Sequence, residues 1–388
     1  MLADACDDPV VKRLLLVSHR PVDQAGGPAA RWRSFARHLP EHGWEVHVLS
    51  ARGTDEYASP GSAQARARVM ETAGRLAGPF FRLAGLRPEA LPLSTLWIPR
   101  GTREIRRRLR GGGYDAVLAT APPFAALLAA SRAAGEVPLV VELRDLWARN
   151  PAFDRDGPIL RRAESGVVKH AAAVVAVTPE AADDLRRRHP GSRIEEIPNG
   201  FEPELLQMRR ETSGTTILHS GTLTKDRPLA PLLAVLKPPL RLVLHGYVAP
   251  EIQKEIAGSG AEVEIVTPSG WEDAVRRITE ADVALVTQAR NAGDATAVAA
   301  KVYEYLALGK PVLSITHGGA TEALLRRLEA DQLCARLDDQ PSIEAALERI
   351  RASDLPPPVP PEKLARYERP HQAEALANLL STLGTNSA

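Results

Sequence analysis

The chain has 388 residues, which is more than one ordinary α/β domain needs, and 44% of them are hydrophobic, enough to build two cores. A formal net charge of +1 excludes a protein that binds nucleic acid over its whole surface, because such proteins are usually more basic. The cysteines Cys6 and Cys334 form no CxxC motif or His/Cys cluster, so we expect a reducing compartment and no structural zinc. Acidic residues precede the short apolar run near the N-terminus, which is unlike a signal peptide, and we expect a cytoplasmic protein.

Short runs rich in β-branched residues alternate with helix-length segments along the chain. The strands expected in the first half are Arg13–Ser18, Glu45–Ser50, Ala116–Thr120, Pro138–Leu143, Ala172–Thr178 and Arg193–Ile197. Those expected in the second half are Thr215–Ser220, Arg241–Gly246, Glu262–Val266, Val283–Thr287 and Pro311–Ile315. Strands separated by helices predict βαβ units, so the fold class is α/β with parallel sheets.

The two series of strands lie on either side of a polar stretch at 201–213, which we interpret as an inter-domain linker. We therefore expect an N-terminal domain at 1–203 and a C-terminal domain at 204–365. The proline-rich stretch 355–363 leads into a final amphipathic segment, which predicts a helix within 366–388. Such a helix could pack back onto the first domain.

Two neighbouring glycines, Gly26 and Gly27, follow the first expected strand and precede a helical stretch. Glycines let the backbone approach a ligand closely, and a helix N-terminus favours negative charge. The spacing is not GxGxxG, so it gives little support to a dinucleotide site. An ordinary βα turn explains the pair as well as a ligand site does.

A second motif runs from Lys301 to Pro311. Lys301 and Glu304 fall on one face of the expected helix, which ends at Gly309. A carboxylate near a helix start can accept two hydrogen bonds from a vicinal diol such as a ribose, and a lysine one turn earlier can meet phosphate. A solvated Lys–Glu pair would be the ordinary interpretation of two such residues alone.

The string Lys301–Pro311 resembles the signature helix of retaining family-four glycosyltransferases of the GT-B type. Other stretches resemble that family in the same order along nearly the whole chain. They are the glycine loop and helix at 26–39, the Pro-Asn-Gly turn at 198–200, the strand and loop at 219–229, and Gly318-Gly319 with Glu322. The resemblance implies two Rossmann-like domains facing across a cleft, with a nucleotide-sugar held between them.

The resemblance also implies roles for individual residues. Glu304 would bind the ribose hydroxyls, while Arg227 and Lys225 would hold the diphosphate near Gly221. Gly26 and Gly27 would let the donor or acceptor approach the first domain, and Gly318 and Gly319 would line the region of the donor sugar or its phosphates. The backbone near 266–268 would read the base.

Three departures place the chain in a divergent branch. The family's frequent second glutamate is Thr296 here, its frequent arginine after the glycine at 221 is Thr222, and its frequent first-domain histidine has no counterpart after Thr120. The reaction usually proposed for this family needs no protein base, because the leaving phosphate accepts the acceptor's proton. The protein then positions the reactants and stabilises the diphosphate.

Glu142 and Asp145 are the acid candidates for catalysis, together with Arg227 as the cation. They follow an expected strand at its carboxyl end, where open α/β sheets place their sites, although a cap or ion pair would explain Asp145 too. His19 ends the first strand and is a further candidate, with a turn role equally open. Asp154 and Asp156 form a DxD string in a Pro/Gly-containing loop, which we interpret as solvated, and we expect no metal and no cofactor.

Residues 61–110 hold eleven arginines and three acids, beside Phe80, Phe81 and Trp97. Such a segment suits an anionic membrane surface, although a solvated helical face explains it too. The expected function is transfer of a sugar, UDP-sugar favoured, to a small-molecule or lipid-linked hydroxyl acceptor. A GT-B nucleotide-sugar epimerase and a non-catalytic sugar-nucleotide-binding protein remain as alternatives.

Overall fold

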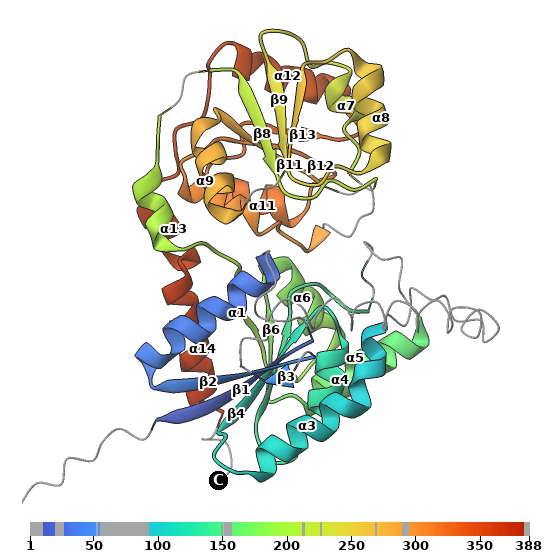
Figure 1. Ribbon diagram of the computed structural model, residues 1–388, viewed down its shortest axis with the longest axis vertical. Coiled ribbons are helices and arrows are strands. Elements are labelled where there is room, and N and C mark those ends of the chain that lie inside the picture. Colours follow the sequence, from blue (N-terminus) through green and yellow to red (C-terminus); the bar gives the residue numbers. More distant parts are fainter. Residues whose placement is uncertain are drawn as a thin grey trace, which may run out of the picture.

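The computed structural model describes residues 11–19, 27–51, 53–54, 93–148, 150, 157–211, 214–225, 227–267, 270–288 and 295–383. They form two domains, each a sheet covered by helices on both faces (Figure 1). The strands of both sheets are buried and rich in Val, Leu, Ile and Ala, as expected for parallel strands that are covered on both sides.

The sheet of the first domain has the order β3-β2-β1-β4-β5-β6-β7. Its strands are β1 (Lys12–Ser18), β2 (Trp44–Ser50), β3 (Gly53–Thr54), β4 (Ala116–Ala121), β5 (Leu139–Leu143), β6 (Ala173–Ala176) and β7 (Ile194–Glu196). All pairs are parallel except β2 with β3.

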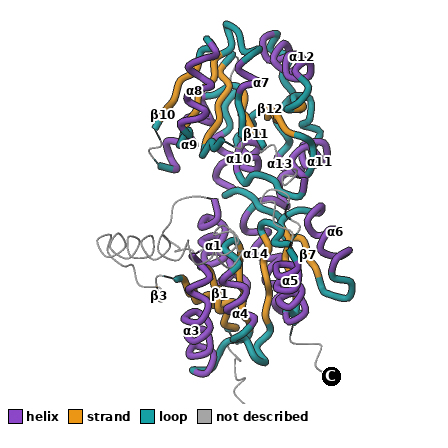
Figure 2. The backbone as a smooth tube through the Cα atoms, turned by 90° about the vertical axis from the view of Figure 1, so that its right-hand side faces the viewer, coloured by secondary structure: helices purple, strands orange, loops and turns teal. Residues whose placement is uncertain are grey.

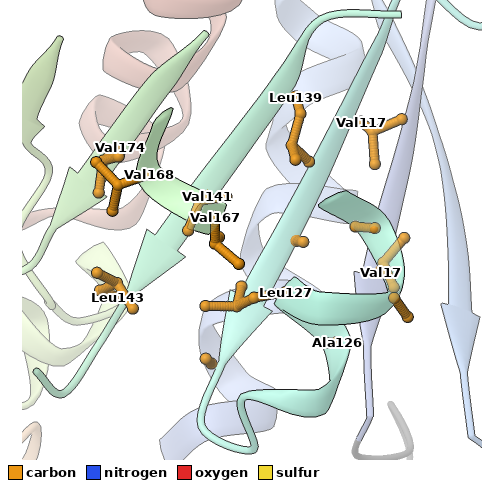
Figure 3. Packing of buried hydrophobic residues seen from close by; sticks show 14 of the residues in the cluster. Val17, Val117, Ala126, Leu127, Leu139, Val141, Leu143, Val167, Val168 and Val174 are labelled. Atoms are coloured by element: carbon orange, nitrogen blue, oxygen red, sulfur yellow. The ribbon is translucent and has the colours of Figure 1, made fainter. Parts of the chain in front are cut away.

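The helical segments of this domain are α1 (Gly27–His38), η1 (Leu39–His42), η2 (Leu93–Trp97), α3 (Ile98–Arg110), α4 (Ala125–Ser131), α5 (Pro158–His170) and α6 (Pro179–Arg188). Side chains from α3, α4, α5 and α6 pack on one face of the sheet. Figure 3 shows part of this core, where Leu127 of α4 and Val167 of α5 lie against Val141 of β5.

The sheet of the second domain has the order β10-β9-β8-β11-β12-β13 and is parallel throughout. Its strands are β8 (Thr216–Ser220), β9 (Arg241–His245), β10 (Val263–Val266), β11 (Val283–Thr287), β12 (Val312–Thr316) and β13 (Cys334–Arg336). Its helices are α7 (Ala230–Leu233), α8 (Pro250–Ser259), α9 (Trp271–Glu280), α10 (Lys301–Ala307), α11 (Ala320–Arg327), α12 (Gln340–Arg351) and α13 (Pro361–Leu364). One face packs against α9, α10 and α11, and the other against α7, α8 and α12.

The last helix, α14 (Arg369–Ser381), returns to the first domain after the short helix η6 (Ala365–Tyr367). It packs beside α1 on the sheet face opposite α4, and both views show it in the lower domain (Figures 1 and 2). At the crossing, the N–H of Phe201 donates to the carbonyl of Tyr367, and the N–H of Arg369 donates to the carbonyl of Phe201. A Cβ at Gly200 would overlap the Tyr367 carbonyl, so the two segments approach closely because this residue is glycine.

The stretch 201–213 differs in part from the expected polar linker. It contains the helix η4 (Pro203–Met208), and Phe201 and Leu205 are buried in the core of the second domain. Each of the eleven expected strands overlaps an observed strand. The two that were not expected, β3 and β13, have two and three residues and are too short to show a hydrophobic pattern.

Candidate active site

Lys301 lies against the loop that follows β8. Its Nζ is 3.1 Å from Nε2 of His219, and a Cβ added to Gly221 would lie 2.8 Å from the same Nζ. Gly221 has φ +131° and Gly246 has φ +142°, and a Cβ on Gly246 would overlap the carbonyl of Gly221. The two glycines therefore let the loops after β8 and β9 pack together beside the lysine.

Burial, aided by the nearby charge of Arg227 and opposed by Glu304, lowers the pKa of Lys301 to about 7. This shift is in the direction expected for an ammonium group removed from water. The lysine is thus a desolvated cation at the carboxyl end of a parallel sheet, where such folds bind their ligands.

His219 is a residue that sequence reasoning missed. It is buried in β8, and its Nδ1 lies 3.1 Å from the carbonyl oxygen of Leu285. A carbonyl only accepts, so Nδ1 carries the proton and Nε2 is left as the acceptor for Lys301. Burial and the charge of Lys301 hold the pKa of His219 well below its usual value. A histidine inside a strand has no sequence signal that links it to a helix 82 residues later.

Arg227 and Lys225 occupy the loop that follows Gly221. Arg227 is half-buried, and its Nη1 donates to the carbonyl of Thr287 at 3.3 Å. It is close enough to lower the pKa values of both Lys301 and His219. Lys225 is exposed. The structure therefore groups Arg227 with Lys301 and leaves Lys225 on the surface of the same loop.

Glu304 lies where the chain crosses between the domains. Burial raises the pKa of its carboxyl group, and the charges of Arg369 and Lys301 partly offset this effect. Arg369 donates to Glu202 at 3.1 Å and to the carbonyl of Ala30 in α1 at 3.0 Å. Glu304 is therefore on the second domain but within the electrostatic reach of groups that contact the start of α1.

Gly318 and Gly319 form the turn before α11, with φ +94° and +100°. The N–H of Gly318 donates to Thr316 Oγ1 at 3.0 Å, and a Cβ on Gly318 would overlap the guanidinium of Arg336. Glu322 in the first turn of the helix is paired with Arg326 at 2.7 Å. The two glycines thus precede the N-terminus of an eight-residue helix, which favours negative charge and packs on the same sheet face as α10.

Glu142, the first acid candidate, is buried and hydrogen-bonded inside the first domain. It is 1% exposed, its Oε1 accepts from Arg31 Nε at 2.8 Å, and its Oε2 accepts from Thr120 Oγ1 at 2.5 Å. Burial would raise its pKa, but Arg31 and Arg144 outweigh that effect and the pKa is lowered. Both oxygens are occupied inside the domain, where Glu142 positions Arg31, and its catalytic role stays a prediction.

Besides this carboxylate, the guanidinium of Arg31 contacts the turn after β7 and helix α14. Its Nη2 donates to the carbonyl of Ile197 at 2.9 Å, and its Nη1 also donates to the carbonyl of Pro198. A weaker contact reaches Gln372 of α14 at 3.4 Å. The buried Arg31–Glu142 pair therefore fixes α1 against the turn at the domain crossing.

Asp145 follows β5 and is half-buried. Its neighbour Arg144 donates to Thr120 Oγ1 at 3.2 Å and to the carbonyl of Pro122 at 2.6 Å. Trp147 stacks on Phe124 with centroids 4.8 Å apart. Asp145 lies at the carboxyl edge of the first sheet, and its role as a catalytic acid stays a prediction.

Of the other candidate site residues in the first domain, the structure describes Gly27 and His19. Gly27 begins α1, whereas Gly26, Asp154 and Asp156 lie outside the described residues. His19 meets Trp97 edge-on at 5.7 Å. Over the described ranges, no group of three or more His, Cys, Asp or Glu side chains could hold a metal ion.

The described part of the arginine-rich segment is α3. A groove of about 800 Å³ lies along it, and its walls are Ile98, Pro99, Thr102, Arg103, Arg106, Arg107, Arg110 and Arg132. Trp97 is buried, so this aromatic residue does not belong to the exposed face that the sequence suggested. Among the helices described, none is both long enough and apolar enough to cross a membrane. The remaining arginines, and Phe80 and Phe81, lie outside the described residues.

Residues 25–205 match the family described as Glycosyltransferase Family 4. A search of curated proteins found no match.

Several solved structures share the fold of the whole chain. A glycosyltransferase from Rickettsia africae ESF-5 aligns with a TM-score of 0.67 at 12% identity, over 97% of this chain and 99% of that one. A structure described as trehalose-6-phosphate from E. coli bound with UDP-2-fluoro glucose aligns with a TM-score of 0.61 at 14% identity, over 96% and 99%. A UDP-N-acetylglucosamine 2-epimerase aligns with a TM-score of 0.55 at 13% identity, over 97% of each chain.

Proposed function

We propose that this chain, which has the GT-B fold and whose residues 25–205 match Glycosyltransferase Family 4, transfers a sugar, with retention of configuration, from a nucleoside-diphosphate sugar to a hydroxyl acceptor. The observation that carries the proposal is the grouping of Arg227 and Glu304 around Lys301, whose Nζ lies beside Gly221. We favour a UDP-sugar because one structural neighbour is bound with UDP-2-fluoro glucose. The proposed acceptor is a glycolipid or polysaccharide precursor or a natural product.

Each group at this site has a task in holding the donor. The carboxylate of Glu304 accepts hydrogen bonds from the ribose hydroxyls, while Lys301 and Arg227 neutralise the diphosphate. The N-terminus of α11 behind Gly318 and Gly319 adds a partial positive charge on the side of the donor sugar. Lys225, on the exposed part of the loop, contributes attraction at longer range.

The reaction that we propose needs no base from the protein. The bond between the anomeric carbon and the diphosphate oxygen breaks, the acceptor oxygen bonds to the same face of that carbon, and the acceptor's proton passes to the departing phosphate. Charge grows on the diphosphate as its bond breaks, so Arg227 and Lys301 stabilise the transition state more than the bound donor. We propose that this reaction is independent of metal ions and that Asp145 orients a hydroxyl of the acceptor or sugar.

A thermal-shift screen tests the donor site directly. The purified protein is heated with UDP, GDP, dTDP, ADP and their common sugars. A ligand that binds the folded state at a hundredfold excess over its Kd stabilises it by about 2.7 kcal/mol. A clear shift with one base supports the donor site and names the base, whereas no shift with any nucleotide would contradict the proposal.

An epimerase is the second candidate, because an epimerase shares the fold over nearly the whole chain. Incubation of the donor without any acceptor separates the two activities. An epimerase would convert the sugar of the donor, whereas the transferase that we propose leaves the sugar unchanged. A protein that binds the donor, and neither converts nor transfers it with any acceptor tried, would be a binding protein instead.

We further propose that the groove along α3 contacts an anionic membrane surface. Arg103, Arg106 and Arg110 are exposed on α3, and Leu96 of η2 next to it is 52% exposed. Basic side chains beside apolar ones suit the interface of a bilayer that contains acidic lipids. Co-sedimentation with phosphatidylglycerol vesicles should fall when Arg103 and Arg110 are both changed to Glu, and should persist when Arg186 and Arg187 of α6 are. Equal loss in both variants, or no binding by the wild type, would contradict this contact.

A further inference from the structure

The cation nearest to Gly221 comes from α10 and not from the loop that follows this glycine. Thr222, the next residue in the loop, is exposed and carries no charge. The ammonium of Lys301 instead reaches the glycine from 80 residues further along the chain. A long flexible side chain in that position needs something to hold it there, because a lysine loses rotamer entropy when it is fixed.

His219 holds the side chain of Lys301 in this position. The partners of its two ring nitrogens fit only one tautomer. The carbonyl of Leu285 accepts the proton on Nδ1, so Nε2 has a lone pair and accepts one N–H of Lys301. This arrangement holds whether the lysine is an ammonium or a neutral amine, because both have an N–H to donate. The other N–H groups of Nζ can donate to a ligand beside Gly221.

The charges around Lys301 disfavour a proton on it when no ligand is bound. His219 faces it from β8 as a neutral imidazole, and Arg227 faces it from the loop as a second cation. Glu304, from its own helix, is the charge that opposes them. A bound diphosphate would add negative charge to this group and would favour the ammonium form.

We propose that His219 is a positioning residue that holds Lys301 beside Gly221, and that this pair takes up a proton when the diphosphate of the donor binds. The inference rests on the proposed function, because it requires a diphosphate at this site. It adds a histidine in the strand beneath the loop to the residues that hold the donor, and it makes donor binding depend on pH.

The direction of that dependence follows from linkage. With the pKa of Lys301 at about 7 in the empty site, the pair is protonated already at pH 6 and is mostly neutral at pH 8. Donor binding at pH 8 therefore takes up close to one proton, and binding at pH 6 takes up almost none. The affinity for the donor falls by up to about tenfold for each pH unit above 7, until the pKa of the bound state is reached.

Isothermal titration calorimetry tests the proton count. The probe is the nucleoside-diphosphate glucose whose base the thermal-shift screen selects, because its diphosphate does not titrate near neutral pH, unlike a free nucleoside diphosphate. Titrations at pH 6 and pH 8, each in two buffers of different ionisation enthalpy, give the number of protons taken up. We expect close to one proton at pH 8. A proton number near zero at both pH values would overturn the inference.

One substitution of Lys301 and two of His219 separate positioning from folding. Lys301→Arg keeps a cation that stays protonated, so proton uptake at pH 8 should disappear while binding persists. His219→Leu removes the acceptor and should weaken binding about tenfold at pH 8, whereas the amide oxygen in His219→Gln should restore part of the affinity. Lys254→Arg on α8, an exposed lysine, is the matched control for Lys301→Arg.

The outcomes distinguish this inference from the proposed function. Tight binding without proton uptake, and unchanged affinity in a folded His219→Leu protein, would overturn the role of the pair and leave the donor site intact. A folded wild-type protein that binds no nucleotide-sugar would overturn both. Thermal unfolding of each variant without ligand shows whether it is folded.

Discussion

The hydroxyl of Thr178, at the start of α6, donates a 2.6 Å hydrogen bond to the backbone carbonyl of Thr296 in the other domain. Thr296 stands five residues before Lys301, at the position where the resembled family often has a glutamate. Close by, Arg327 at the end of α11 pairs with Glu180 of α6 at 2.9 Å. The segment that leads into α10 is therefore held by the first domain through its backbone, with no need for a particular side chain at 296.

Thr178→Val should weaken donor binding about fivefold, because the lost hydrogen bond is worth on the order of 1 kcal/mol and loosens the start of α10. Thr178 also caps α6 by accepting from the N–H of Ala181 at 3.1 Å. Thr178→Ser keeps both bonds and is the matched control. Calorimetry with the donor measures the difference, and equal affinities of the Val and Ser proteins would show that the contact does not steady the site.

Glu304→Ala should weaken donor binding by about 1 kcal/mol for each ribose hydrogen bond that is lost. Glu344→Ala on α12, an exposed glutamate, controls for the loss of a carboxylate. Because burial raises the pKa of Glu304, its carboxylate is protonated at a higher pH than an ordinary glutamate, and donor affinity should decline as the pH falls through that value. Unchanged affinity in Glu304→Ala would remove Glu304 from the donor site.

Arg227→Ala should lower kcat by about 10²- to 10³-fold, the usual effect of deleting a group that stabilises a developing negative charge. Arg227→Lys keeps the charge and should recover part of the rate. Steady-state kinetics at saturating donor separate this effect from weaker binding. A rate near that of the wild type would mean that Lys301 alone provides the needed charge.

Glu142→Gln should destabilise the protein by about 3–5 kcal/mol, since it leaves the buried guanidinium of Arg31 without its counter-charge. The lowered pKa of Glu142 gives the pH dependence: its contribution is present above the ordinary carboxyl pKa and is lost as the pH falls through the lowered folded value. Urea unfolding measures both effects. Asp145→Asn is the comparison and should change turnover more than stability. A stable Glu142→Gln protein without turnover would support the catalytic role expected of Glu142.

The sheets could be predicted because parallel strands buried on both faces appear as continuous apolar runs, as in Leu14–Val17 and Val283–Val286. Strand β13, with the sequence Cys-Ala-Arg, has no such run and takes its place only because β12 lies beside it. Local patterns therefore predict strands that have their own hydrophobic signal, and tertiary contacts decide the rest.

The site could be predicted only as far as residues act within one local motif. Lys301 and Glu304 lie on one helical turn, so their spacing alone grouped them. The partner of Lys301 is a histidine in another strand, and the partner of Glu142 is Arg31, 111 residues away. Ligand sites lie at the carboxyl ends of parallel strands, and this rule placed Glu142 at the carboxyl edge of the first sheet. It could not show that Arg31 of α1 pairs with this carboxylate.

The return of α14 to the first domain makes that domain discontinuous in sequence, and this sets an order on folding during synthesis. Ala373, Leu376 and Leu380 complete the apolar layer around Leu14, Trp32 and Phe35, yet the ribosome makes them after the entire second domain. The core of the first domain therefore cannot be completed until residues 369–381 have been synthesised. The second domain, whose strands and helices from β8 to α12 are contiguous, can assemble first and bring the two ends of its partner together.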